Sequence, residues 1–235
     1  MIVLGSQKNC IYLPNPKTGS TTIREVIRYT NQIYYPNILE FNKTLYADKE
    51  YHPHYSYYDM QSFLKKYDIN IDKCYTYTTI RNPWARIVSL YKYAGYDKNG
   101  NPQWHKDYDM TTAYQYSFNN FMENFEIQKK GVVPIDQYAF DENGKQLVDK
   151  IFILENLDLC EFMQCLHTNC NIEKEETLKK YHESGQKMPT VMPDIKVVNI
   201  DKSKKSYKDF YTEQWMIDKV KTLFKKDIEI GNYIF

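Results

Sequence analysis

Two short segments combine basic, glycine and hydroxyl-bearing residues in patterns that suit an anion. The first is Pro-Lys-Thr-Gly-Ser-Thr-Thr at 16–22, and the second is Arg-Asn-Pro-Trp-Ala-Arg-Ile-Val-Ser-Leu-Tyr at 81–91. Each follows an apolar, strand-like run and precedes a helical pattern, so unpaired backbone N–H groups at each helix start point toward one spot. Two such sites on neighbouring strands predict a ligand with two separated phosphates.

The residue order in the first segment separates it from the common nucleotide-binding loop. In a Walker loop the lysine comes directly after the last glycine. Here Lys17 precedes Gly19, and no glycine lies five residues upstream of Lys17. This order disfavours an ordinary kinase or NTPase.

Together the two segments resemble the sulfotransferases that use 3′-phosphoadenosine-5′-phosphosulfate (PAPS). In that family a P-K-x-G-[ST]-[ST]-x loop holds the 5′-phosphosulfate, and an R-[ND]-P-x-x-R-x-x-S-x-Y segment holds the 3′-phosphate. The resemblance implies a nucleoside-kinase-like α/β fold, PAPS as donor, adenosine 3′,5′-bisphosphate (PAP) as product, and no metal. It also implies donor contacts from Lys17, Thr18, Gly19, Ser20, Thr21, Thr22, Arg81 and Ser89.

Sulfuryl transfer needs a cation at the bridging oxygen, a base for the acceptor hydroxyl and a clamp for the donor. Lys17 is the candidate cation, and Gly19 lets the backbone approach the phosphate closely. The guanidinium of Arg81 suits a bidentate grip on phosphate, to which the Ser89 hydroxyl adds one bond. For Arg86 an internal salt bridge and a ligand contact remain equal alternatives.

Two histidines lie between the donor segments, in Tyr-His-Pro-His-Tyr-Ser-Tyr-Tyr-Asp at 51–59. Histidine suits general-base work because its unperturbed pKa, about 6.5, lies near neutrality. The stretch is similar to the Y-H-x-H-x-S-Y-x-D segment of the heparan sulfate and uronyl 2-O-sulfotransferases. That likeness implies His54 as the base, His52 as its helper and a carbohydrate hydroxyl as the acceptor. A metal site at the pair lacks an obvious third ligand.

Two further stretches resemble the family less specifically. Residues 149–157 look like its strand followed by E-x-L, which makes Glu155 a candidate buried structural carboxylate. Residues 199–205 are similar to its N-x-x-x-S-[KR] stretch, which makes Lys204 a candidate ligand of the 3′-phosphate. A solvated basic loop is the alternative for this second stretch.

Hydrophobic periodicity predicts alternating strands and helices. The alternation indicates one α/β domain over 1–235, with a mainly parallel sheet flanked by helices. A tight turn is expected at 141–144, and the last helix is expected to end in a charged Lys-Lys-Asp. In the helix at 57–67 we expect Tyr58, Phe63, Leu64 and Tyr67 to face the core. We expect strands at 10–14, 74–80, 149–154 and 195–200, and helices at 20–30, 57–67, 84–94, 111–128, 157–167 and 212–227.

Composition favours a soluble, globular protein. The 235 residues are 42% hydrophobic with a mean hydropathy of −0.68, and no stretch approaches the roughly 18–20 apolar residues of a membrane span. The start of the chain lacks the features of a signal peptide, which favours a cytoplasmic protein over the alternative of an excised catalytic domain. A net charge of +1 provides no general attraction for nucleic acid.

The five cysteines are an odd number without the pair spacing of a metal site. Cys10 and Cys74 fall in predicted core strands, where we expect small buried thiols. A reducing compartment fits this pattern best.

Two other functions are compatible with parts of the pattern. A non-catalytic protein that senses adenosine bisphosphate needs the two anion sites but neither Lys17 nor the histidine pair. A divergent small-molecule kinase needs a phosphate loop, and the position of Lys17 before Gly19 opposes it.

Overall fold

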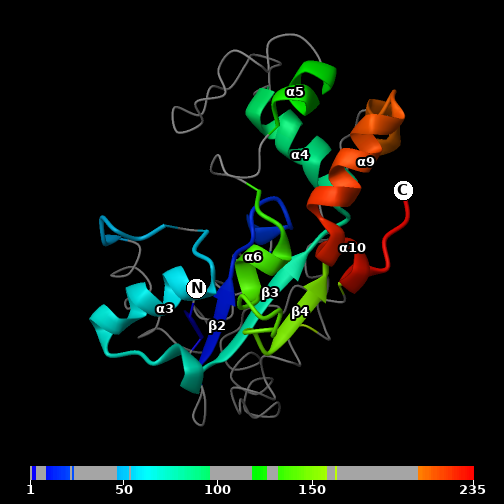
Figure 1. Ribbon diagram of the computed structural model, residues 1–235. Coiled ribbons are helices and arrows are strands. Elements are labelled where there is room, and N and C mark those ends of the chain that lie inside the picture. Colours follow the sequence, from blue (N-terminus) through cyan, green and yellow to red (C-terminus); the bar gives the residue numbers. More distant parts are fainter. Residues whose placement is uncertain are drawn as a thin grey trace, which may run out of the picture.

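The fold is α/β, as the alternation of patterns predicts, with a small sheet flanked by helices (Figure 1). The structure is a computed structural model. It describes residues 2–3, 9–21, 23, 47–52, 54–95, 118–125, 132–157, 162 and 206–235.

Three parallel strands form the centre of the sheet, whose order is β1-β2-β3-β4. They are β2 (Cys10–Leu13), β3 (Tyr75–Ile80) and β4 (Lys150–Ile153), and each agrees with a predicted strand within one residue. Leu13 lies opposite Thr78, and Ile80 lies opposite Ile153. The chain therefore leaves all three strands at the same edge of the sheet.

The strand β1 (Ile2–Val3) pairs antiparallel with β2 and was not expected from the sequence. Two residues are too few to show the alternation by which a strand is recognised. The predicted strand at 195–200 lies outside the described residues.

The helices next to the two motifs begin where the sequence indicates. Helix α4 (Pro83–Gly95) follows β3, and the side chain of Asn82 accepts a hydrogen bond from the Ala85 N–H at 3.1 Å. Helix α3 (Tyr57–Leu64) continues as a 3₁₀ turn (Lys65–Tyr67). Of the predicted helix at 20–30, the structure describes only the start, where Ser20, Thr21 and Ile23 are helical.

The expected helix at 212–227 is two helices, α9 (Gln214–Leu223) and α10 (Lys225–Gly231). They are separated at Phe224, whose φ of −115° and ψ of 34° are not helical. Its fully buried ring and the buried Asp227 in α10 explain the break, because a straight helix ending in solvent would not bury both. The predicted helix end at Asp227 was wrong, because α10 continues to Gly231 and Asp227 is buried inside it.

Two further helices complete the described fold: α5 (Phe118–Asn124), inside the predicted helix at 111–128, and α6 (Ile135–Ala139), which the sequence did not indicate.

The predicted turn at 141–144 is confirmed by Gly144, with φ of +79°, and by the hydrogen bond from the Asp141 N–H to the Lys145 carbonyl at 3.0 Å. Of the predicted helix at 157–167, Leu157 is non-helical and Phe162 is helical, and the rest lies outside the described residues.

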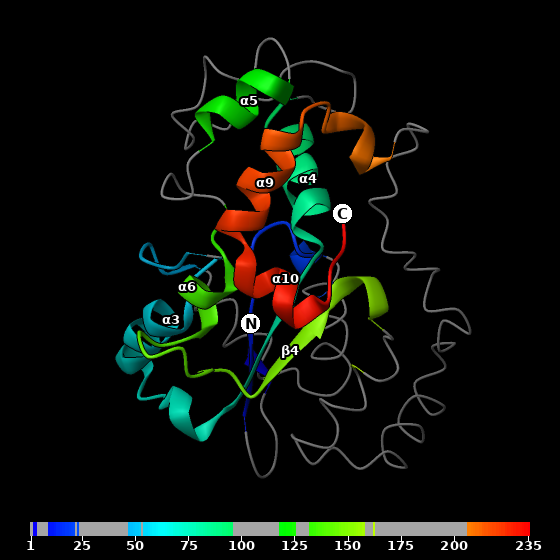
Figure 2. The same ribbon diagram turned by 45° about the vertical axis from the view of Figure 1, so that its right-hand side comes forward.

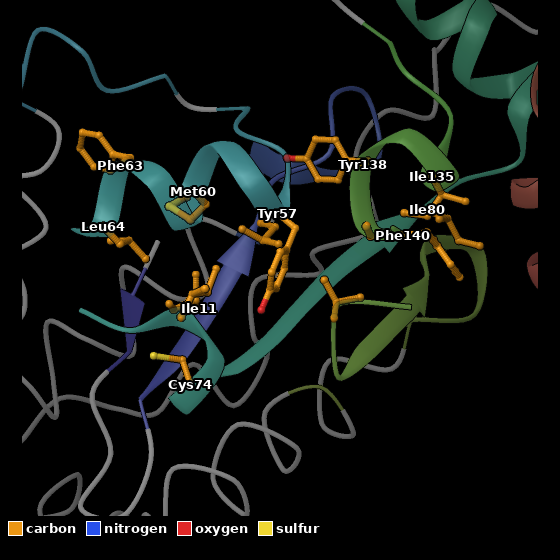
Figure 3. Close-up of a cluster of buried hydrophobic side chains, with 14 residues drawn as sticks. Ile11, Tyr57, Met60, Phe63, Leu64, Cys74, Ile80, Ile135, Tyr138 and Phe140 are labelled. Atoms are coloured by element: carbon orange, nitrogen blue, oxygen red, sulfur yellow. The ribbon is translucent and has the colours of Figure 1, made fainter. Parts of the chain in front are cut away.

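One hydrophobic cluster packs α3 and α6 against the sheet. Figure 3 shows Met60 and Leu64 of α3 facing Ile11 of β2. Phe63 and Leu64 are buried as predicted, whereas Tyr58 is 51% exposed and Tyr67 only partly buried. Tyr58 lies outside the face defined by the buried residues of α3, which explains its exposure.

A second, aromatic cluster lies among α4, α5 and α9, and α4 and α9 run side by side in Figures 1 and 2. Trp84 is buried and donates its indole N–H to the Ile217 carbonyl at 3.2 Å. The helix that starts at the second motif is thereby held firmly to the rest of the protein.

The two cysteines within the described residues differ. Cys74 is a buried free thiol, as expected. Cys10 is disulfide-bonded, with a partner outside the described residues, so the prediction of a thiol there was wrong. Burial and a strand position do not distinguish a core thiol from half of a disulfide, because both are small and apolar.

Candidate functional site

The two predicted anion sites lie next to each other at the edge where the parallel strands end (Figure 1). The loop at 14–19 follows β2, Arg81 and Asn82 follow β3, and a 3₁₀ turn (Leu154–Asn156) follows β4. Ligands of open α/β sheets bind outside the carboxyl ends of the strands. The arrangement therefore agrees with a site at this edge.

Four consecutive carbonyl oxygens of the loop after β2 accept hydrogen bonds from side chains. The Pro14 carbonyl accepts from His54 Nδ1 at 2.8 Å, and the Asn15 carbonyl accepts from Thr18 Oγ1 at 2.7 Å. The Pro16 carbonyl accepts from Arg86 Nε at 3.0 Å, and the Lys17 carbonyl accepts from Arg81 Nη1 at 3.5 Å. Because the peptide unit is planar, fixing a carbonyl on one side turns the next N–H to the opposite side. The N–H groups of Lys17 and Thr18 thus point away from Arg86 and Arg81.

The loop also contains two residues with left-handed backbone angles. Lys17 has φ of +62° and Gly19 has φ of +78°. A Cβ atom at residue 19 would lie 2.6 Å from Leu154 Cδ1, closer than real contacts allow. Glycine is therefore required at 19 both for its backbone angle and for its contact with the turn after β4.

A chain of buried hydroxyls links the loop to the sheet. Thr18 uses its single proton for the Asn15 carbonyl, so in the 2.7 Å contact between Thr18 and Thr79 the hydroxyl of Thr79 donates. Tyr12 then donates to Thr79 at 3.0 Å. The Thr18 side chain thus serves the interior of the protein, and its predicted donor contact is left to its backbone N–H.

Lys17 and Arg81 form a pair of neighbouring cations. Burial lowers the pKa of the Lys17 ammonium to about 8, and the positive charge of Arg81 contributes to this shift. Burial also lowers the pKa of the Arg81 guanidinium, while the carboxylate of Glu155 acts in the opposite direction. An anion between them would stabilise the charged form of both groups.

Glu155 organises the end of β3 rather than the core. Its Oε1 accepts the Asn82 N–H at 2.8 Å, and its Oε2 accepts the Tyr233 hydroxyl at 2.7 Å. The expectation that this carboxylate is buried was wrong, since it lies at the surface on the turn after β4. Its two hydrogen bonds connect β4, the start of α4 and the segment after α10.

The histidine pair lies beside the loop, although it is distant in the sequence. The Nδ1 atom of His54 donates to the Pro14 carbonyl, because that oxygen can only accept. In the neutral ring this leaves Nε2 as the basic nitrogen. His52 is exposed, its ring centroid lies 5.9 Å from that of His54, and its Nδ1 accepts the His54 N–H at 3.2 Å.

The residues that follow the pair fix its position. Ser56 and Asp59 form a capping box at the start of α3, with Asp59 Oδ2 accepting the Ser56 N–H at 3.1 Å. The serine and aspartate in the resembled stretch thus have a structural explanation.

Arg86 makes the internal salt bridge, one of its two predicted alternatives. It is fully buried, and its Nη1 lies 3.3 Å from Asp227 Oδ1. The second oxygen of Asp227 accepts the Ile135 N–H at 2.8 Å.

The remaining predicted site residues lie in different places. Ser20 is buried at the start of the helix after the loop, and Thr21 is exposed there. Ser89 is partly exposed on α4, the helix that begins after Arg81. Thr22 and Lys204 lie outside the described residues.

Sequence reasoning missed four residues that shape the site: Asn15, Thr79, Asp227 and Tyr233. For Asp227 a signal exists, because it lies three residues after the apolar Phe224 and three before the apolar Ile230, spacings that place residues on one helical face. An acidic residue on an apolar face indicates a buried partner. The other three carry no signal within their own segments.

Within the described ranges, no three His, Cys, Asp or Glu side chains are grouped to hold a metal ion. No helix there is long and apolar enough to cross a membrane. Comparisons with protein-family models, curated proteins and solved structures found no match.

Proposed function

We propose that this protein is a sulfotransferase that moves a sulfuryl group from PAPS to a hydroxyl of a carbohydrate acceptor. One observation supports this most: the hydrogen bond from His54 to Pro14 brings a candidate base next to the loop that carries Lys17. Transfer to a hydroxyl uses a general base beside the phosphosulfate loop, whereas a protein that only senses or stores the nucleotide does not need one.

In this proposal the loop at 16–22 binds the 5′-phosphosulfate. The N–H groups of Lys17 and Thr18, the start of the following helix and the Ser20, Thr21 and Thr22 hydroxyls donate to the anion. The Lys17 ammonium offsets the charge that develops on the bridging oxygen. Arg81, Ser89 and Lys204 bind the 3′-phosphate.

The transfer step needs only one proton movement on the protein. The acceptor oxygen forms a bond to sulfur while the bond from sulfur to the bridging oxygen breaks in line. His54 Nε2 takes the proton of the acceptor hydroxyl, and PAP leaves with the bonding electron pair. His52 assists by bonding the His54 backbone.

The finer fold and the compartment are part of the proposal. The parallel strands and the loop after β2 are compatible with a nucleoside-kinase-like sulfotransferase fold. The sequence predicts a cytoplasmic protein, whereas the disulfide at Cys10 is typical of an oxidising compartment. Alkylation of the cysteines without a reductant distinguishes these two locations.

The test is sulfate transfer from PAPS to a panel of glycans, together with calorimetric titration of the wild-type protein with PAP. We expect PAP binding without added metal and transfer to at least one glycan. Stabilisation by ATP–Mg²⁺ but not by PAP would support the kinase alternative instead. PAP binding without transfer to any acceptor would support the non-catalytic sensor.

A further inference from the structure

We propose that Arg86 is a positioning residue, which holds the phosphosulfate loop in its binding shape and is itself held by Asp227 of α10. This inference rests on the proposed function for its ligand. It assigns a role in donor binding to an interior ion pair and to the helix that carries Asp227.

The contacts of Arg86 divide between the loop and α10. Nε donates to the Pro16 carbonyl at 3.0 Å, Nη2 donates to Asn15 Oδ1, and Nη1 pairs with Asp227 Oδ1 at 3.3 Å. A guanidinium presents its donors in a rigid, planar fork, so these partners fix one another's positions. Two of the three belong to the residues directly before Lys17.

The loop needs such support because its backbone is unusual. Lys17 has a left-handed φ of +62°, which a residue with a side chain adopts only when its surroundings impose it. Turning the Pro16 carbonyl toward Arg86 directs the Lys17 N–H to the other side of the peptide plane. Arg86 thus determines where one of the proposed phosphate donors points.

Stability alone does not account for the pair. Both side chains are fully buried, and a buried ion pair usually adds no more stability than apolar residues of the same volume. The ring of Phe224 already lies 5.7 Å from the guanidinium carbon, so the surroundings would accept an apolar side chain. The directed hydrogen bonds to the loop are what an apolar residue would not replace.

The pair is anchored on the side away from the loop. Asp227 Oδ2 accepts the Ile135 N–H at 2.8 Å, which ties α10 to α6. Figures 1 and 2 both place α10 between α9 and the end of β4. The position of the loop therefore depends on α10, more than 200 residues further along the chain.

The test uses Arg86→Lys and the double variant Arg86→Met/Asp227→Leu. Lysine keeps a charge for Asp227 but lacks the fork, and the double variant removes the pair without leaving a buried charge. Phe121→Leu in α5 is the control, because Phe121 is buried in the aromatic cluster among α4, α5 and α9. All are measured well below their unfolding temperatures.

The first measurement is PAP affinity by calorimetry. We expect at least about tenfold weaker binding for both Arg86 variants, since each loses hydrogen bonds from a charged donor. Phe121→Leu should bind within about twofold of the wild type, because destabilisation far from a site leaves the folded state intact. Wild-type affinity in both Arg86 variants would overturn the inference.

The second measurement is hydrogen–deuterium exchange at 15–20 without ligand, which does not depend on the proposed function. We expect about tenfold faster exchange there in Arg86→Lys and unchanged exchange in Phe121→Leu. Unchanged exchange in Arg86→Lys would overturn the inference. If the wild type does not bind PAP, the proposed function fails while this measurement still decides the role of Arg86.

Discussion

The Nδ1 atom of His54 donates a hydrogen bond of 2.8 Å to the carbonyl oxygen of Pro14, 40 residues earlier in the chain. This contact orients the imidazole ring and at the same time holds the first of the four bonded carbonyls of the loop. One side chain therefore has a role in positioning and a proposed role in proton transfer. Its two nitrogen atoms allow these roles to be tested separately.

The replacement His54→Asn is expected to abolish most transfer while PAP binding persists. The asparagine amide can donate to Pro14 from a position near that of Nδ1, but it offers no basic nitrogen. We expect the rate of sulfate transfer to fall about 10²–10⁴-fold, as for loss of a general base. Rate and PAP affinity are measured on the same preparations.

His54→Ala and His52→Ala serve as the comparison for that variant. His54→Ala loses both roles, so it should also weaken PAP binding, whereas His52→Ala should retain PAP affinity. Full turnover by His54→Asn on the true acceptor would show that another group is the base.

The affinity for PAP should decrease as the pH rises through about 8. Burial and Arg81 lower the pKa of Lys17 to about 8, so the free protein loses this proton as the pH rises. A bound phosphate favours the charged form and raises that pKa, so binding above it requires uptake of a proton. Calorimetric titration over this pH range measures the change.

Lys17→Arg is the matched control, because its guanidinium stays protonated across the range. We expect its PAP affinity to vary little with pH around 8. A pH-independent affinity in the wild type would mean that the Lys17 charge does not contribute to binding.

Replacing Gly19 by alanine should destabilise the protein and impair PAP binding. The change imposes a side chain on a φ of +78° and places a Cβ atom 2.6 Å from Leu154 Cδ1. Together, backbone strain and overpacking should lower the free energy of unfolding by about 2–4 kcal/mol, as measured by urea denaturation.

Gly144→Ala isolates the backbone contribution, because Gly144 has φ of +79° but no heavy atom within 4 Å of the added carbon. It should lower the free energy of unfolding by only about 1–2 kcal/mol and leave PAP affinity unchanged. Equal effects of the two substitutions would refute a specific role for the contact between Gly19 and Leu154.

The buried hydroxyl chain predicts a cost for Thr79→Val, which keeps the shape of the side chain and removes its oxygen. Thr18 and Tyr12 would each lose a buried partner. We expect the free energy of unfolding to fall by about 1–3 kcal/mol in urea denaturation. Thr222→Val, at an exposed threonine of α9, should change it by less than about 0.5 kcal/mol.

Alkylation under non-reducing, denaturing conditions should leave Cys10 and its disulfide partner unmodified. Reduction should make all five reactive and should lower the stability of the folded protein by about 2–5 kcal/mol. Mass spectrometry counts the labels, and Cys74 provides an internal control as a thiol. Five labels without a reductant would instead agree with the reducing compartment that the sequence favours.

Much of the local structure could be predicted because its signals lie within a few residues of each other. The strands before Pro14 and Arg81 were located within one residue, and α4 begins one residue before its predicted start at 84. Alternation, helical spacing and a proline at a helix start are signals formed by residues that lie close together in the sequence. The sequence did not predict the break at Phe224, because the break is explained by the burial of Asp227, which depends on tertiary packing.

The sequence by itself determined that two segments with basic and hydroxyl-bearing residues each follow a strand-like run and that a histidine pair lies between them. Only the tertiary structure decided that His54 contacts Pro14 and that Arg86 turns inward to Asp227, 141 residues away. The sequence around an arginine near a phosphate motif is the same whether its side chain faces a ligand or the core. The path of the chain between distant segments selects between these orientations, since burial and hydrogen bonding depend on what packs there.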